Sequence, residues 1–298
     1  MEAVSGRPTI YAFSSGRRGC IILNESDECL KKVLFTLTLH SSLLTHHFHT
    51  KGFRMEIVGI IPARYQSTRF PGKPLAELHG KPMIRHVYER SLRARTLSQL
   101  LVATDDLRIL KAVEAFGGNA MLTREDHPSG TDRLAEAAEK LRLSDKDIVV
   151  NIQGDEPLVE PEMIEVLVEA LLQSRNCPMA TLAFLIEDRE GFFDPNVVKV
   201  VVDENGRALY FSRSPIPFQR DDSDKKASFL KHLGYYAYRS AFLSTFAGLA
   251  AGPLEEAEKL EQLRALEYGY PIQVAISPFE TIGVDTPEDL ERAARILG

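Results

Sequence analysis

From residue 55 onward the sequence alternates short apolar runs, rich in Val and Ile, with longer stretches of helical period. The runs that predict strands are 57–61, 99–104, 147–152, 180–186, 197–202 and 272–276. The stretches that predict helices are 82–94, 106–117, 131–142, 161–173, 256–269 and 286–297. Strands and helices that alternate in this way form βαβ units. Several runs are apolar throughout, which is typical of strands covered on both faces. We therefore predict an α/β fold with a mainly parallel, mixed sheet and helices on both faces.

Residues 187–245 interrupt this alternation. Turn signals occur at 194–196 and 203–206, and a polar run precedes the strand-like residues 234–239. Asp, Asn, Gly and Pro gathered between apolar runs are typical of turns. We therefore predict an inserted β-rich region, with residues 219–228 as a mobile loop.

Residues 1–54 differ from the rest of the chain. They contain two of the three cysteines and four of the eight histidines, and a natural beginning, MEIVGIIPAR, follows at Met55. The histidine cluster at 45–50 has no acidic or thiol partner close by, so it gives little support to a metal site. We expect 1–54 to be a poorly ordered extension, or sequence upstream of the true start, and 55–298 to be the folded domain.

Charge and cysteine content exclude several classes of protein. The net charge of −6 argues against nonspecific binding of nucleic acid, which requires basic patches. No segment reaches the roughly 18 consecutive apolar residues of a membrane-spanning helix. Three cysteines without metal-ligand spacing are too few for a disulfide framework. These features predict a cytoplasmic protein that neither spans a membrane nor binds nucleic acid.

A cationic loop follows the first predicted strand. The segment IIPARYQSTRFPGKPL carries Arg64, Arg69 and Lys73. It is not a P-loop, because Ser67 and Pro74 occupy positions that the pattern reserves for Gly and for Ser or Thr. Ligands of open α/β sheets bind outside the carboxyl ends of the strands, which is where this loop begins. The loop is either a solvated basic turn or a grip on the oxygens of a polyphosphate.

Acidic residues are expected at the same edge of the sheet. The motif QGDEP places Asp155 and Glu156 in a tight turn after a predicted strand, and Asp285 precedes a helix that begins near 286–289. Asp155 either caps its turn or binds Mg²⁺, a cation usually held by one or two carboxylates together with substrate phosphates. Asp285 is either a spare acid or a second metal ligand.

The motif SGTDR at 129–133 leads into a predicted helix. Backbone N–H groups and the helix dipole favour an anion at such a position, and Arg133 adds a full positive charge.

Two further motifs leave alternatives open. His232, Tyr235 and Tyr236 lie in a strand-like segment, where sheet packing explains the tyrosines as well as ligand contact does. Glu261 and Gln262 lie on a predicted helix and fit either a ligand site or a solvated face. The chain has no G-x-S-x-G elbow, and no cysteine lies beside a base. Cations and acids at one edge instead indicate phosphoryl or nucleotidyl transfer.

Taken together, these motifs resemble one family, the 3-deoxy-manno-octulosonate cytidylyltransferases, also called CMP-Kdo synthetases. The matching segments, in family order, are IIPARYQSTRFPGKPL, VATDD, SGTDR, NIQGDEP, LYFSRSPIPF, KHLGYYAYR, LEQLR and GVDTPEDL. They span nearly all of the chain after Met55. The resemblance implies a nucleotidyltransferase-type α/β fold, a homodimer built through the inserted region, and dependence on Mg²⁺. It also implies transfer of CMP from CTP to Kdo for lipopolysaccharide biosynthesis.

The resemblance also implies roles for individual residues. CTP would lie along 62–73, contacting Pro62, Ala63 and Ser67, with the three loop cations on its phosphates. Asp155 and Asp285 would hold Mg²⁺. The residues implied to bind the sugar are Arg133, at its carboxylate, and Gln153, His232, Tyr235, Glu261 and Gln262, at its hydroxyls.

The sequence also bears on three alternative functions. CMP-sialic acid synthetases carry a first loop richer in Gly and Lys, so sialic acid is the less favoured sugar. A non-catalytic nucleotide-binding regulator on the same fold would not need both acids and all three cations. A guanylyl- or adenylyltransferase stays open, because cytosine preference depends on the resemblance alone.

Overall fold

The computed structural model describes residues 55–66, 70–187, 189–220 and 229–297. The expected extension 1–54 and most of the expected loop 219–228 lie outside these ranges, as do two expected nucleotide-binding residues, Ser67 and Arg69.

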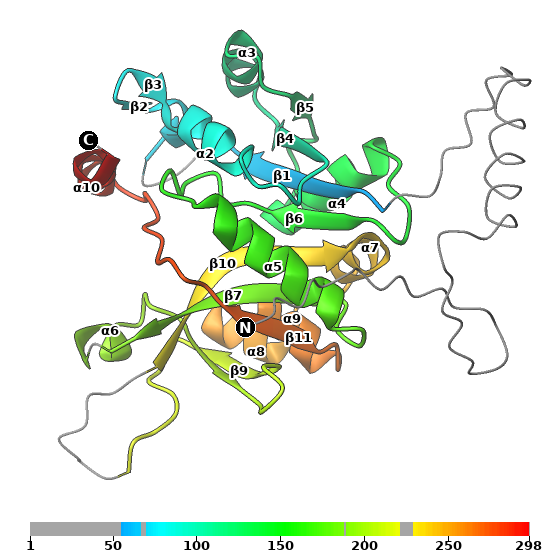
Figure 1. Ribbon diagram of the computed structural model, residues 1–298, viewed down its shortest axis with the longest axis vertical. Coiled ribbons are helices and arrows are strands. Elements are labelled where there is room, and N and C mark those ends of the chain that lie inside the picture. The colour runs from blue at the N-terminus through cyan, green and yellow to red at the C-terminus, as the bar shows by residue number, and fades with distance from the viewer. Residues whose placement is uncertain (1–54, 67–69, 188, 221–228, 298) are drawn as a thin grey trace, which may run out of the picture. The chain divides into compact units, whose positions relative to one another are not determined.

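A mixed sheet of nine strands forms the centre of the described part of the chain (Figure 1). Seven strands cross it in the order β11 (Ile272–Ile276), β7 (Met179–Ile186), β10 (Phe229–Arg239), β6 (Ile148–Asn151), β1 (Ile57–Ala63), β4 (Gln99–Thr104) and β5 (Ala120–Leu122). The pairs β1–β4, β1–β6, β4–β5 and β7–β11 are parallel, whereas β10 is antiparallel to β6 and β7. The mainly parallel, mixed sheet predicted from the sequence is confirmed.

The region in which an insert was expected contributes three strands. β8 (Lys199–Val202) and β9 (Ala208–Ser212) form an antiparallel extension that joins the main sheet through β10. β10 itself runs through the middle of the main sheet, between β7 and β6. We refer to β8 and β9 as the β-extension.

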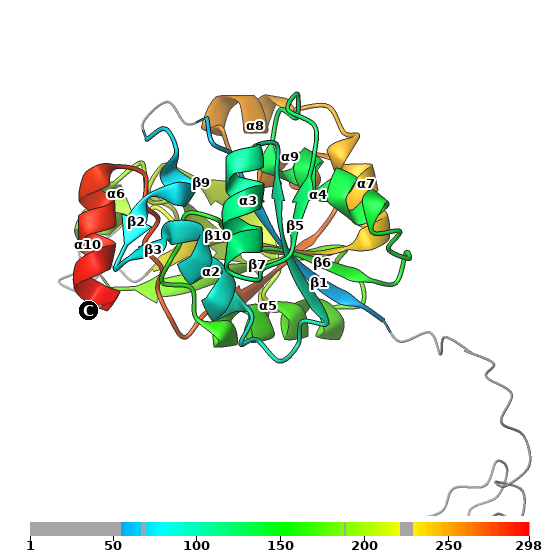
Figure 2. The same cartoon turned by 90° about the horizontal axis from the view of Figure 1, so that it is seen from above.

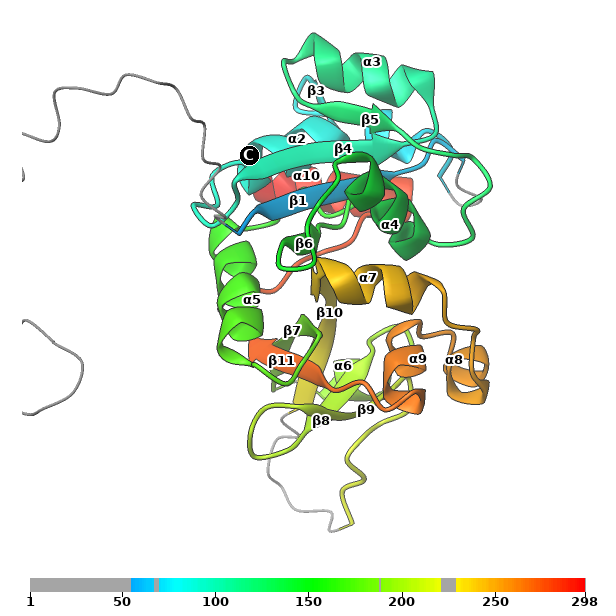
Figure 3. The same cartoon turned by 90° about the vertical axis from the view of Figure 1, so that its right-hand side faces the viewer.

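Helices cover both faces of the sheet. One core contains residues of α2 (Met83–Ser91), α3 (Leu107–Ala115) and α5 (Pro161–Gln173), and the other contains residues of α4 (Gly130–Lys140), α7 (Ser240–Ala247) and α9 (Gln262–Glu267). Neighbouring residues of β1 divide between the two cores, because successive side chains of a strand point to opposite faces: Ile61 belongs to the first and Ile60 to the second. Figure 3 shows α5 on one side of the strands and α4 and α7 on the other.

Five short elements and a longer C-terminal helix complete the described chain. They are η1 (Lys73–Leu75), β2 (Glu77–Leu78), β3 (Lys81–Pro82), α6 (Arg189–Phe193), α8 (Pro253–Glu258) and α10 (Pro287–Leu297). The last helix, α10, lies beside β2 and β3 (Figure 2), where the imidazole of His79 is 2.8 Å from the carbonyl oxygen of Ala294.

One predicted helix is wrong in its extent. The stretch 256–269 forms two short helices, α8 and α9, because Lys259 at the end of α8 takes a left-handed conformation with φ of 53°. A left-handed residue cannot continue an α-helix. The break turns the chain so that Glu261 is the N-cap residue of α9 and Gln262 its first residue.

Within the described residues, no helix has the length and apolar character needed to cross a membrane.

Candidate active site

The loop after β1 is fastened to the start of α4. Arg64 Nη2 donates to the carbonyl oxygens of His127, at 2.5 Å, and Ser129, at 3.1 Å. Ser129 and Asp132 form a capping box, in which each side chain accepts a hydrogen bond from the backbone N–H of the other. Arg64 is therefore held beside a helix N-terminus, a position that favours a bound anion.

Lys73 brings the two acids of the predicted metal site together. Its ammonium lies 2.7 Å from Oδ2 of Asp155 and 3.3 Å from Oδ1 of Asp285. The backbone holds these segments in place, because the N–H of Val284 donates to the carbonyl oxygen of Asp155 at 2.9 Å. Residues that are 82 and 212 positions from Lys73 thus meet at one point.

The turn that carries Asp285 is ordered by the helix that follows. The carboxylate of Asp289 accepts hydrogen bonds from the backbone N–H groups of Asp285, at 3.1 Å, and Thr286, at 3.0 Å. The sequence predicted a helix start here, and α10 begins at Pro287.

The two carboxylates fit a magnesium site. The described residues contain no group of three or more His, Cys, Asp and Glu side chains that could hold a metal ion. Mg²⁺ does not require such a group, because one or two carboxylates suffice when water and substrate phosphates supply the other ligands. Asp155 and Asp285, which share one ammonium, have the hard oxygen donors and the proximity that this arrangement needs.

A third carboxyl group, that of Glu156, directly follows Asp155 in the chain. Burial raises the pKa of Glu156 to about 7, and the negative charge of Asp155 acts in the same direction. Glu156 is therefore partly neutral near pH 7 and adds less negative charge to this edge than the motif QGDEP suggests.

Arg133, the expected contact of the sugar carboxylate, is buried and paired within the protein. Its side chain is 0% exposed, Nη2 lies 2.7 Å from Oδ2 of Asp105, and Nη1 donates to Oγ1 of Thr123. A buried guanidinium needs a fixed partner, and Asp105 supplies it. Nε of Arg133 has no hydrogen-bond partner among the described residues, and contact with a sugar carboxylate stays a prediction that this burial does not support. Arg133 joins α4 to the segments that follow β4 and β5.

The segment KHLGYYAY divides its side chains between the two faces of β10. His232 packs against Phe211 and Tyr236, with ring centroids 5.0 and 5.5 Å apart. Tyr235 belongs to the core on the opposite face and is 0% exposed. Strand alternation therefore places Tyr236, rather than the expected Tyr235, on the face of His232. Burial lowers the pKa of His232 to about 3, so its imidazole is neutral at physiological pH.

The other expected sugar-binding residues lie near both faces of this strand. Gln153 donates through Nε2 to the carbonyl oxygen of Gly234, at the irregular part of β10. Glu261 accepts a hydrogen bond from Oγ1 of Thr131, at 2.7 Å, which joins α9 to the start of α4. Gln262 is buried, and its Nε2 has no hydrogen-bond partner within the described part of the chain.

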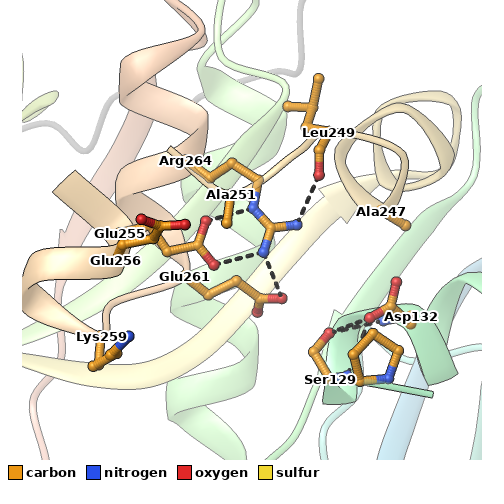
Figure 4. A pocket seen from close by; sticks show the side chains of 11 residues that line it. Ser129, Asp132, Ala247, Leu249, Ala251, Glu255, Glu256, Lys259, Glu261 and Arg264 are labelled. Carbon is orange, nitrogen blue, oxygen red and sulfur yellow. Dashed lines mark hydrogen bonds and ion pairs between the residues drawn. The ribbon is translucent and has the colours of Figure 1, made fainter. Parts of the chain in front are cut away.

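A cavity of about 590 Å³ opens between the start of α4, the end of α7, and α8 and α9 (Figure 4). Arg264 lies across it and pairs with Glu255 through two contacts of 2.6 Å. Glu261 is within 4.0 Å of the same guanidinium. The lining residues are Pro128, Ser129, Asp132, Ala247, Leu249, Ala251, Glu255, Glu256, Lys259, Glu261 and Arg264.

Comparison with known proteins defines the class. The family model described as cytidylyltransferase matches residues 58–282, which is most of the chain. The chain therefore belongs to the cytidylyltransferases.

Two relatives with high sequence identity indicate which cytidylyltransferases this chain belongs to. A 3-deoxy-manno-octulosonate cytidylyltransferase of Syntrophobacter fumaroxidans is 67% identical over 243 residues, which cover 82% of this chain and 97% of the relative. An 8-amino-3,8-dideoxy-manno-octulosonate cytidylyltransferase of Shewanella pealeana is 56% identical over 237 residues, covering 79% of this chain and 96% of the relative. Within the cytidylyltransferases, this chain belongs to the 3-deoxy-manno-octulosonate cytidylyltransferase family.

A solved structure supports the same assignment. The structure of a CMP:2-keto-3-deoxy-manno-octonic acid synthetase complexed with CTP has a TM-score of 0.76 and 46% sequence identity. The match covers 81% of this chain and 98% of that protein. The α/β nucleotidyltransferase fold expected from the resemblance is confirmed.

The sequence does not predict three contacts of this region. Asp105 lies in the motif VATDD, but nothing in the sequence identifies Arg133 as its partner. Thr131 lies at the expected start of a helix, and its hydrogen bond to Glu261 is not predicted. Tyr236 could have been chosen over Tyr235 by counting alternate positions from His232, since residues two and four apart share a face of a strand.

Proposed function

We propose that this protein transfers CMP from CTP to the anomeric hydroxyl of 3-deoxy-D-manno-octulosonate (Kdo), giving CMP-Kdo and pyrophosphate. The observation that carries the proposal is the meeting of Lys73, Asp155 and Asp285 at the carboxyl edge of the sheet, beside the loop that holds Arg64. Cations and paired carboxylates at one point suit a reaction in which a triphosphate must be bound and its charge neutralised.

The nucleotide side of the site consists of the loop at 62–73 and the start of α4. Arg64 and Lys73 bind phosphate oxygens, and Pro62 and Ala63 line the path of the nucleotide. The sequence adds Ser67 and Arg69 to this loop, although both lie outside the described residues. The N-terminus of α4, beside Arg64, contributes backbone N–H groups to the same anion.

Asp155 and Asp285 would hold Mg²⁺. When bound, this ion neutralises phosphate charge and makes a coordinated hydroxyl more acidic. The two carboxylates would hold the ion beside Lys73, one of the loop cations. The shared position of these acids at Lys73 supports the assignment, because each lies within hydrogen-bond distance of the same ammonium.

The acceptor sugar would occupy the side of the site formed by β10 and α9. His232 and Tyr236 face the same side of β10. Glu261, the N-cap residue of α9, accepts a hydrogen bond from Thr131 of α4. Gln262 supports this placement, because a buried amide donor without a partner costs about 1–3 kcal/mol and gains from a bound hydroxyl. Gln153 would reach the sugar from the motif QGDEP. Tyr236 replaces Tyr235 in this set, and Arg133 is omitted from it.

The reaction balances without a further reactant. The anomeric oxygen of Kdo forms a bond to the α-phosphorus of CTP, the bond from that phosphorus to the bridging oxygen of the β-phosphate breaks, and pyrophosphate leaves. The proton of the hydroxyl passes to solvent. Positioning of the two substrates in line supplies much of the rate enhancement.

We further propose that the protein is a cytoplasmic homodimer that serves lipopolysaccharide biosynthesis. Exposed apolar side chains in and beside the β-extension support a dimer through this region: Leu209 is 62% exposed and Phe218 is 85% exposed. Apolar side chains this exposed favour contact with another protein surface.

The proposal is tested by pyrophosphate release from the full chain with Mg²⁺, CTP and Kdo. Parallel reactions replace Kdo by its 8-amino-8-deoxy analogue or by sialic acid, and CTP by ATP, GTP or UTP. Release with CTP and Kdo that stops on chelation of the metal is the expected result. Release only with the 8-amino sugar would show that the protein has the sugar specificity for which the Shewanella relative is named. No release with any pair, from folded protein that binds CTP, would favour a non-catalytic regulator.

A further inference from the structure

A buried cation lies in the β-extension, apart from the loop cations. Lys199, the first residue of β8, is 0% exposed. Its ammonium donates to the carbonyl oxygens of Asp194, at 3.0 Å, Val197, at 2.6 Å, and Arg213, at 2.5 Å. Burial lowers the pKa of Lys199, while the negative charges of Asp194 and Glu258 oppose that effect. Three fixed acceptors around one buried ammonium hold the ends of β8 and β9 together.

Glu258, the last residue of α8, fastens the same segment from the other side. Its Oε1 accepts from Oγ of Ser212 at 2.6 Å, and its Oε2 accepts from the backbone N–H of Arg213 at 3.0 Å. The side chain of Arg213 donates in return, through Nε, to the carbonyl oxygen of Glu258 at 2.8 Å. We call Lys199, Ser212, Arg213 and Glu258 the anchor cluster.

Both sides of the anchor cluster lead directly to the proposed sugar side of the site. After Glu258 the chain turns through one left-handed residue and reaches Glu261. On the other side, Phe211 precedes Ser212, and its ring centroid is 5.0 Å from that of His232. The backbone N–H of His232 also donates to the carbonyl oxygen of Val198, at 2.8 Å, next to Lys199. A displacement of the cluster would therefore separate α9 from β10.

We propose that Glu258 and Lys199 are positioning residues for the acceptor sugar. They hold the turn that bears Glu261 and the strand that bears His232 at a fixed separation, and so set the affinity for the sugar acid without contacting it. The inference depends on the proposed function, because it takes Glu261 and His232 as sugar contacts. The nucleotide loop is held by different contacts and should be insensitive to changes in the anchor cluster.

Steady-state kinetics of the full chain test this inference, with KM measured separately for Kdo and CTP. Glu258→Ala removes both acceptor oxygens, and we expect it to raise KM for Kdo at least about tenfold and to change KM for CTP less than about twofold. Glu258→Gln keeps one acceptor oxygen and should recover part of the loss. Glu204→Gln is the matched control, since Glu204 is an exposed acid in the turn between β8 and β9, and both KM values should stay unchanged.

The outcomes separate this inference from the proposed function. Failure of the wild-type protein to use CTP and Kdo overturns both. If the wild type is active, an unchanged KM for Kdo in Glu258→Ala, or an equal rise of both KM values, overturns the positioning role alone. Should Glu258→Ala fail to fold, Ser212→Ala removes the hydrogen bond to Glu258 and the local one from the backbone N–H of Ser214. We expect it to raise KM for Kdo about threefold. No change in that variant would also overturn the inference.

Discussion

The ammonium of Lys73 lies 2.7 Å from Oδ2 of Asp155, at the carboxylate that we propose as a magnesium ligand. The same ammonium lies 3.3 Å from Oδ1 of Asp285, so one cation faces both acids. Only 14% of the Lys73 side chain is exposed, and reduced contact with water strengthens such an attraction. Lys73 would therefore compete with a divalent cation for the same oxygens. Phosphates that attract Lys73 would release the two carboxylates for the metal.

The first prediction follows from this competition. Lys73→Met removes the competing ammonium, so we expect Mn²⁺ to bind the nucleotide-free protein about three- to tenfold more tightly than it binds the wild type. Titration followed by the electron paramagnetic resonance of free Mn²⁺ measures this affinity directly. Lys111→Met, which changes an exposed lysine of α3, serves as the control. An unchanged or weaker affinity in Lys73→Met would show that the lysine does not compete with the metal.

The second prediction concerns the pH dependence of stability. Burial lowers the pKa of His232 to about 3 from an ordinary value of 6.5. Between these values the unfolded chain binds a proton that the folded chain does not, so this group reduces stability as the pH falls through that window. Urea denaturation at pH 7 and pH 5 should show a smaller loss of unfolding free energy for His232→Gln than for the wild type, by up to about 2 kcal/mol. Equal losses would contradict the lowered pKa.

The third prediction tests the buried pair of Arg133 and Asp105. Arg133→Ala empties a fully buried position and leaves the carboxylate of Asp105, whose side chain is only 16% exposed, without its partner. We expect the free energy of unfolding to fall by about 3–5 kcal/mol, as for other buried pairs from which one member is removed. Arg175→Ala, at an exposed arginine after α5, should change it by less than about 0.5 kcal/mol. A loss of unfolding free energy below about 1 kcal/mol for Arg133→Ala would mean that the ion pair contributes little to the stability of the protein.

The parts of the site that could be predicted from the sequence are those governed by local rules. The position of Lys73 after β1 and of Asp155 after β6 follows from strand patterns and from the rule that ligands bind at the carboxyl edge. The helix start at Thr286 and Pro287 follows from capping preferences. These features need only a few neighbouring residues to be recognised.

The parts that could not be predicted depend on distant contacts or on single backbone angles. The partner of Arg133 is 28 residues away, and the partners of Glu258 are 45 and 46 residues away. Pairings of this kind appear only when the strands are in place. The break between α8 and α9 comes from a left-handed lysine, Lys259, a conformation that its residue type does not favour.

The most direct test of the central claim is a ³¹P nuclear magnetic resonance experiment with CTP, Kdo and Mg²⁺. It compares the wild type with Asp155→Asn and Asp285→Asn, after circular dichroism has shown that both variants are folded. The account predicts that the wild type forms one phosphodiester and one pyrophosphate for each CTP consumed. Each variant should be slower by at least about a hundredfold. Product formation at the wild-type rate in either variant would contradict the assignment of the two carboxylates as the centre of the reaction.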